Sequence, residues 1–160
     1  MDLTEVSHNI NLAKLDNARW LKYASELIEG SSVSKEGIPT YRDECIPCQW
    51  LYDHSDEVSQ LYQKIDKSEI NLFHFDIMEQ IEILRYDLHE NYLQIFKTYL
   101  RELNNSFFSH LFHLKKKVSD YEKIDAKRHL NEMKRVVEEL NLMLDHLEQS
   151  LYQMCELNSA

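Results

Sequence analysis

Glycine and proline are nearly absent from this sequence, and their distribution constrains the fold more than any other feature. The 160 residues include two of each, and all four (Gly30, Gly37, Pro39 and Pro47) lie in the first third of the chain. Because these two residue types interrupt regular structure most strongly, the sequence after Pro47 contains no strong breaker. This composition favours long helices over a sheet, and we therefore predict an all-α fold.

The first long helix is predicted from about Thr4 to Glu29, with Gly30 as its stop. Apolar residues recur in it at alternating steps of three and four, which is typical of one face of an α-helix. The predicted buried stripe is Ile10, Ala13, Asn17, Trp20, Ala24 and Leu27. Asn17 is thus a polar amide at a position where we expect the core.

Further helices are predicted along the rest of the chain. A short one covers Cys45 to Tyr52, and a long one follows the capping residue Ser55. The buried stripe of the long helix is Ile70, His74, Ile77, Ile81, Leu84, Leu88, Tyr92 and Ile95, so that His74 faces the core. A third long helix is predicted with a stripe of Phe107, Leu111, Leu114, Val118 and Tyr121.

The last forty residues carry a cap signal and a heptad repeat. Ser119 and Glu122 match a capping box, which predicts either a break or a kink in the chain there. The heptad positions are Leu130, Met133, Val137, Leu140, Leu144, Leu147, Leu151 and Met154. Val136 and Met143 widen this stripe, so the helix either packs only on its own bundle or also projects into a partner copy.

Together these elements predict an antiparallel four-helix bundle with an extra short helix and a long C-terminal heptad helix. We assign residues 1–118 to a helical bundle, which the family resemblance described below implies is sensory. We assign residues 119–160 to a C-terminal signalling or dimerisation helix packed on that bundle.

Charge and hydropathy narrow the classes of partner. A net charge of −10 disfavours binding to nucleic acid or to anionic membranes, because basic side chains are needed to offset phosphate. The sequence has neither a membrane-spanning apolar stretch nor the features of a signal peptide at its start. Three cysteines without secretory context are typical of a reducing compartment, so we expect a cytoplasmic protein.

Cys45 and Cys48 form a Cys-x-x-Cys pair, a spacing found in redox dithiols and in zinc knuckles. A thioredoxin-type dithiol requires a βαβ unit, which the sequence does not predict. A zinc knuckle requires a second ligand pair, whereas Cys155 stands alone near the end of the chain. Two inert thiols and a sensor of thiol oxidation both remain open.

The residues around the two tryptophans form a pattern of three segments. They read Asp16-Asn17-Ala18-Arg19-Trp20, then Cys45-Ile46-Pro47-Cys48-Gln49-Trp50, then Ile70-Asn71-Leu72-Phe73-His74. Over about residues 10–100 this order resembles the chemoreceptor zinc-binding (CZB) domain family, in which three histidines and one cysteine hold zinc inside a four-helix bundle. By position, the resemblance assigns the histidines to Asn17, Ile70 and His74 and the cysteine to Cys45.

The resemblance therefore implies a degenerate metal site of Asn17, Cys45 and His74, with Cys48 at a position where the family has glycine. Because an amide is a poor zinc ligand and isoleucine is none, the site either binds zinc weakly or persists as a polar pair of Asn17 and His74. A hemerythrin-like oxygen carrier is disfavoured, since the segment from His74 to His89 leaves no room for a turn between antiparallel helices.

CZB-like domains occur in chemoreceptors and at the front of diguanylate cyclases. The resemblance implies a cytoplasmic regulatory domain of a bacterial signalling protein, such as the N-terminal input domain of a diguanylate cyclase in c-di-GMP signalling. We expect a homodimer with an output domain in cis after Ala160. We expect no active site within this region, because no nucleophile–base pair, phosphate loop or carboxylate pair can be placed. The alternative is a ligand-free scaffold for dimerisation or partner binding.

Overall fold

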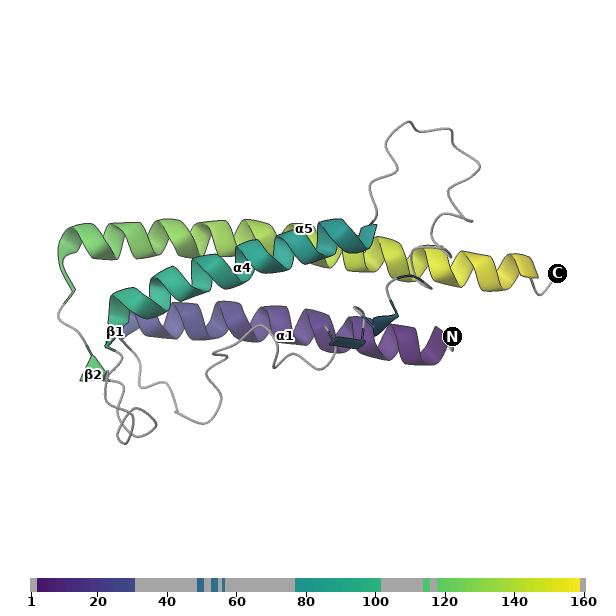
Figure 1. Ribbon diagram of the computed structural model, residues 1–160, viewed down its shortest axis with the longest axis horizontal. Helices are drawn as coiled ribbons and strands as arrows, with labels where there is room; N and C mark the ends of the chain where they lie inside the picture. The colour runs from purple at the N-terminus through teal and green to yellow at the C-terminus, as the bar shows by residue number, and fades with distance from the viewer. Residues whose placement is uncertain are drawn as a thin grey trace, which may run out of the picture.

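The computed structural model describes residues 3–30, 49–50, 53–54, 56, 77–101, 114–115 and 118–158 of the chain. Within this part the protein is all-helical apart from one short pairing of two-residue strands (Figure 1). The elements are α1 (Leu3–Glu29), α4 (Ile77–Tyr99), β1 (Leu100–Arg101), β2 (Leu114–Lys115) and α5 (Asp120–Asn158). The predicted all-α class is confirmed, whereas the described residues make three long helices rather than a complete four-helix bundle.

Helix α1 follows the sequence prediction closely. It ends at Glu29, and Gly30 takes a φ of +75°, a left-handed conformation that glycine adopts without the steric cost of a Cβ. The amide of Gly30 donates a hydrogen bond to the carbonyl oxygen of Leu27. Every residue of the predicted stripe is buried, including the polar Asn17.

The middle of the chain agrees with the prediction only in part. Helix α4 confirms the later half of the predicted long helix, and its earlier half, including Ile70 and His74, lies outside the described residues. Of the predicted short helix, Gln49 and Trp50 are helical, and the two cysteines lie outside the described residues.

The third predicted helix is wrong at Leu114 and Lys115. These residues form β2, which pairs antiparallel with β1, with Leu100 opposite Lys115. The strand pair joins the chain that leaves α4 to the chain that approaches α5. The spacing of apolar residues carries no information about backbone pairing with a distant segment. Here such pairing forms a strand where the spacing predicts a helix.

The start of α5 resolves the choice between a break and a kink. Val118 and Ser119 are not helical, and α5 begins at Asp120. The backbone amide of Glu122 donates to Ser119 Oγ at 3.2 Å, and the amide of Ser119 donates to Glu122 Oε2 at 2.8 Å. This reciprocal capping box satisfies two backbone donors that the first turn leaves free, which explains the helix start.

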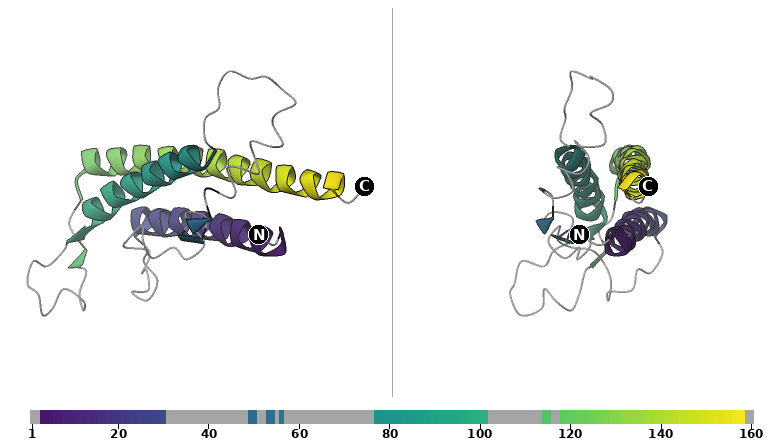
Figure 2. Two further views of the ribbon diagram at one scale, coloured as in Figure 1. Left: turned by 45° about the vertical axis from the view of Figure 1, so that its right-hand side comes forward. Right: turned by 90° about the vertical axis from the view of Figure 1, so that its right-hand side faces the viewer.

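The three helices pack side by side, with α5 antiparallel to both α1 and α4 (Figures 1 and 2). Helices α1 and α4 therefore run in the same direction. The end-on view in Figure 2 shows the three helices at the corners of a triangle, so each helix turns one stripe toward a shared core.

That core consists of two clusters of buried apolar side chains. The aliphatic cluster, near the two ends of the chain, contains Val6, Ile10, Ala13, Ile77, Met78, Ile81, Leu140, Leu144, Leu147 and Leu151. The aromatic cluster, toward the opposite end of the bundle, contains Trp20, Ala24, Leu27, Leu88, Tyr92, Ile95, Phe96, Ala126, Met133, Val136 and Val137. Leu84 packs against both clusters. From Leu130 to Leu151, the heptad stripe predicted for α5 thus faces its own bundle.

Candidate functional site: a polar layer between two apolar clusters

Two asparagines interrupt the core at the level where the aliphatic cluster meets the aromatic cluster. On α1, Asn17 lies between Ala13 and Trp20 in the buried stripe and is only 3% exposed. Its Nδ2 donates to Oδ1 of Asn141 on α5 at 3.1 Å. A buried amide requires such a partner, because an unmade hydrogen bond costs its full desolvation energy. The two helices therefore hold each other in register at this level.

An ion-pair group extends this amide pair along the seam between α1 and α5. Lys14 Nζ contacts Asp145, and its distance to Glu148 Oε2 is 3.7 Å. Glu148 also accepts a hydrogen bond from the hydroxyl of Ser7. We refer to Lys14, Asn17, Asn141, Asp145 and Glu148 as the polar layer. Its charged members are partly exposed, so we expect them to contribute less stability than the buried amide pair.

The structure describes one of the three predicted metal-site residues and shows its hydrogen-bond partner. Asn17 faces the core as predicted, while Cys45 and His74 lie outside the described residues. The hydrogen-bond partner that the structure describes for Asn17 is Asn141, which the sequence reasoning missed. A signal was present, because Asn141 falls between Val137 and Leu144 at the same four-then-three steps that place Asn17 in its stripe.

The described part of the chain does not by itself fit a zinc site. None of its histidine, cysteine and acidic side chains form a group of three or more that could hold a metal ion. Zinc prefers imidazole and thiolate ligands, whereas Asn17 offers an amide whose nitrogen already donates to Asn141. In the described structure Asn17 is thus engaged by a hydrogen bond between helices.

An aromatic group adjoins the polar layer on the side of the aromatic cluster. Trp20 Nε1 donates to Asp16 Oδ2 at 3.2 Å. The edges of its ring meet the rings of His89 and Tyr92, with centroids 5.3 and 4.7 Å away. The hydroxyl of Tyr92 is buried and has no hydrogen-bond partner in the described part of the chain. Burial raises the pKa of Tyr92, and the neighbouring Tyr23 raises it further.

The second tryptophan lies on the other side of the polar layer. Trp50 packs against the aliphatic cluster, and its Nε1 donates to Glu5 Oε1 at 3.0 Å. Its ring stacks on His54 with a centroid distance of 4.5 Å. The two tryptophans that carry the family resemblance therefore flank the level of Asn17, one in or against each cluster.

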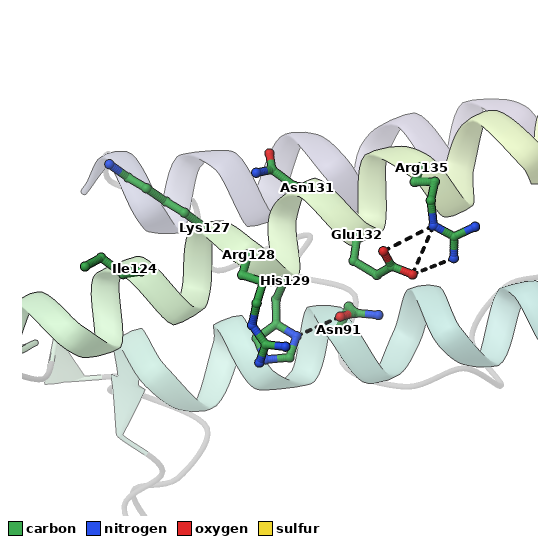
Figure 3. A pocket seen from close by; sticks show the side chains of 8 residues that line it. All are labelled: Asn91, Ile124, Lys127, Arg128, His129, Asn131, Glu132 and Arg135. Atoms are coloured by element: carbon green, nitrogen blue, oxygen red, sulfur yellow. Dashed lines mark hydrogen bonds and ion pairs between the residues drawn. The ribbon is translucent and has the colours of Figure 1, made fainter.

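An open hollow of about 600 Å³ lies on the surface of α5, away from the polar layer (Figure 3). His129 Nδ1 lies 2.7 Å from Asn91 Oδ1, and Asn91 Nδ2 donates to the carbonyl oxygen of Asp87. His129 Nδ1 therefore carries the proton and donates to Asn91. His129 Nε2 lies 3.5 Å from Asp125 Oδ2, so both ring nitrogens face oxygen atoms of α4 or α5. This arrangement anchors the two helices to each other.

The other charges of this hollow are largely paired along α5. Arg128 bonds Asp125 and holds the pKa of that carboxyl below its usual value. Arg135 bonds Glu132 and Glu139, and it lowers the pKa of Glu132. Such exposed pairs along one helix stabilise that helix slightly and do not create a concentrated anion or cation site.

Comparisons of this chain with protein-family models, with curated proteins and with solved structures found no match. Among the described helices, none combines the length and the apolar character that crossing a membrane requires.

Proposed function

We propose that this chain is a regulatory domain in which the polar layer couples a signal to the position of α5. The observation that carries this proposal is the Asn17–Asn141 pair, because it joins α1 to α5 by a hydrogen bond from a buried amide at the boundary of two apolar clusters. Moving α5 along its axis by one turn, about 5.4 Å, would exchange apolar contacts for similar ones but would break this pair. A single buried amide pair of this kind favours one register over its neighbours.

The family resemblance supplies the signal in this proposal. A zinc ion held by Cys45 and His74 would recruit the Oδ1 of Asn17, and turning that side chain toward the ion would draw its Nδ2 away from Asn141. A ligand shifts the equilibrium only if it binds one arrangement better than the other. A ligand that recruits Asn17 would therefore favour the arrangement in which the hydrogen bond to Asn141 is broken.

The proposal also includes the complete four-helix bundle and the partners that the sequence analysis predicts. We propose an antiparallel four-helix bundle, which acts as a cytoplasmic homodimer and controls an output domain in cis, such as a diguanylate cyclase. One feature of the fold supports the fourth helix. Because α1 and α4 run in the same direction, the end of α1 and the start of α4 lie toward opposite ends of α4, roughly 35 Å apart for its 23 residues, a span that a fourth, antiparallel helix would cover.

Zinc titration with hydrogen exchange tests this function. We expect zinc to bind near one ion per chain and to speed amide exchange in α5 around Asn141, because the interhelical pair opens. Cys45→Ala and His74→Ala should abolish both effects. Cys155→Ala is the matched control and should keep both. If zinc binding is absent, or if it leaves exchange in α5 unchanged, the zinc-sensing form of the proposal is wrong.

A ligand-free scaffold is the second candidate, and a separate observation favours it. Ile83 on α4 and Leu142 on α5 are 53% and 68% exposed, which is unusual for large apolar side chains in the middle of helices. With Leu84 and Met143 they line an open groove of about 430 Å³ between α4 and α5. Under this candidate a partner helix covers the groove, and removing metal from the protein leaves its assembly unchanged.

A further inference from the structure

The side of α5 opposite Met133, which we call its outer face, carries two exposed apolar side chains. Ile124 and Leu142 are each 68% exposed. They are eighteen residues apart, which is five turns of an α-helix, so they lie on the same side. Met133, halfway between them, is fully buried on the opposite side of α5. The two apolar side chains are therefore placed symmetrically about the level of Met133.

Charge is distributed unevenly about the same level. Residues 120–135 carry five lysines and arginines against four acidic residues. Residues 136–153 carry four acidic residues and neither lysine nor arginine. Lys127 and Glu138, both exposed, make no ion pair within the described part of the chain. A second α5 lying antiparallel would place the acidic half against a half whose net charge is +1, with the exposed Lys127 and Glu138 as the charges that can pair across the interface.

We propose that a second copy of this chain docks antiparallel along the outer face of α5, with its two-fold axis at the level of Met133. This inference rests on the homodimer of the proposed function, and it specifies the surface through which the two copies bind and their relative orientation. It is isologous, so each contact occurs twice. Ile124 meets the partner's Leu142, because both lie nine residues from Met133. Lys127 meets the partner's Glu138, since they lie six and five residues from that level on the same side of the helix.

The surface of the molecule has hollows at the required places. The hollow in Figure 3 is lined by Ile124, Lys127 and Asn131, and the figure shows Lys127 and Asn131 pointing away from α4. The second hollow is the groove that contains Leu142 and Ile83. The two-fold operation brings the partner's Leu142 to the first hollow and the partner's Ile124 to the second. Ile124 thereby gains the partner's Leu142 as an apolar neighbour, and the partner's Ile124 extends the apolar groove that Leu142 and Ile83 already line.

The orientation has a measurable consequence for the ends of α5. Gln153 lies twenty residues beyond Met133, so in the antiparallel dimer the two Gln153 residues are about 60 Å apart along the helix axis. A parallel dimer would hold them side by side. Output domains joined to α5 would therefore lie at opposite ends of the antiparallel assembly.

Sedimentation equilibrium of the whole chain tests the surface. We expect a dimer, and we expect Ile124→Glu and Leu142→Glu each to weaken dimerisation by about tenfold or more, as for a central interface residue. Leu15→Glu on α1, which replaces a leucine that is 67% exposed, is the matched control and should leave the dimer unchanged. A dimer unaffected by both α5 variants overturns the surface and leaves the homodimer standing. A monomeric wild-type protein overturns both.

A charge exchange and a cross-link test the orientation. Lys127→Glu and Glu138→Lys should each weaken the dimer, and the chain with both changes should regain it, with all three effects reduced at high salt. Chains with Ile124→Cys, mixed with chains with Leu142→Cys, should form a disulfide between positions 124 and 142, identified by mass spectrometry of the peptides. Cross-links between two copies of position 124 would show a parallel dimer and overturn the proposal.

Discussion

The two halves of the core differ in chemistry although the same three helices build both. The aliphatic cluster contains neither aromatic nor polar residues, and its members come from the first parts of α1 and α4 and the later part of α5. The aromatic cluster encloses Trp20, Tyr92 and Phe96 and includes the buried Tyr92 hydroxyl. Aliphatic side chains of similar volume exchange places at little cost, whereas aromatic rings pack in restricted geometries. We therefore expect the aliphatic half to tolerate a shift of α5 and the aromatic half to resist it.

The polar layer lies between these two halves of the core, and this position determines which part of α5 a signal would move. A signal at Asn17 would act where the half of the core that tolerates a shift of α5 meets the half that resists it. The shift would therefore occur in the C-terminal part of α5, which packs in the tolerant half. In a core of uniform chemistry, a signal at the same place would favour movement of neither end of α5. The four predictions below test this contrast, from the largest expected effect to the smallest.

The largest effect is expected from a cavity in the aliphatic half. Leu147 is fully buried, so Leu147→Ala should lower the free energy of unfolding by about 2–5 kcal/mol through lost burial and the cavity left behind. Urea unfolding followed by circular dichroism measures this loss. Leu15→Ala, at an exposed position of α1 outside the proposed dimer interface, should change stability by less than about 0.5 kcal/mol. Equal effects of the two variants would contradict the packing of α5 described here.

The polar layer is tested by a double-mutant cycle. Asn17→Ala should cost about 1–3 kcal/mol, because it leaves the Asn141 amide without its partner. Replacing both asparagines with leucine should cost much less or even stabilise the protein, since no buried polar group remains unpaired. The cycle gives the coupling energy between the two positions. Strictly additive effects would mean that the two side chains do not interact.

The capping box tests whether the two halves loosen independently. Ser119→Ala should cost about 1 kcal/mol and fray the start of α5, which contributes Ala126 to the aromatic cluster. Hydrogen exchange should then increase in the first turns of α5 and remain unchanged beyond Asn141. If the increase extended along all of α5, the helix would respond as one unit and the contrast between the halves would fail.

The smallest effect is expected from the Tyr92 hydroxyl. Tyr92→Phe should leave stability unchanged or raise it by up to about 1 kcal/mol, because the hydroxyl is buried without a partner in the described structure.

The same residue predicts a pH dependence. Because the pKa of Tyr92 is raised in the folded protein, the unfolded chain releases this proton first, near its ordinary value of 10. The stability associated with neutral Tyr92 is therefore fully present below pH 10 and is lost as the pH rises above it, by up to about 1.4 kcal/mol per pH unit. Unfolding curves from pH 9 to 11 should show a shallower decline for Tyr92→Phe than for wild type. Parallel declines would mean that Tyr92 is not shielded from water.

Local sequence signals account for much of what the described helices show. The ends of α1, the capping box before α5 and the buried stripes of all three helices depend on interactions within a few residues, so they can be deduced from spacing alone. The burial of Asn17 follows in the same way, from its place between Ala13 and Trp20.

Tertiary structure alone decided which residues meet across the core. The pairing of Asn17 with Asn141, the strand contact of Leu114 with Arg101, and the division into two clusters all join segments far apart in sequence. The periodicity of a helix shows which of its faces is buried. Many neighbouring helices, in many axial registers, could cover that face equally well. The hydrogen bonds and side-chain shapes that select one of them exist only once the helices have packed together.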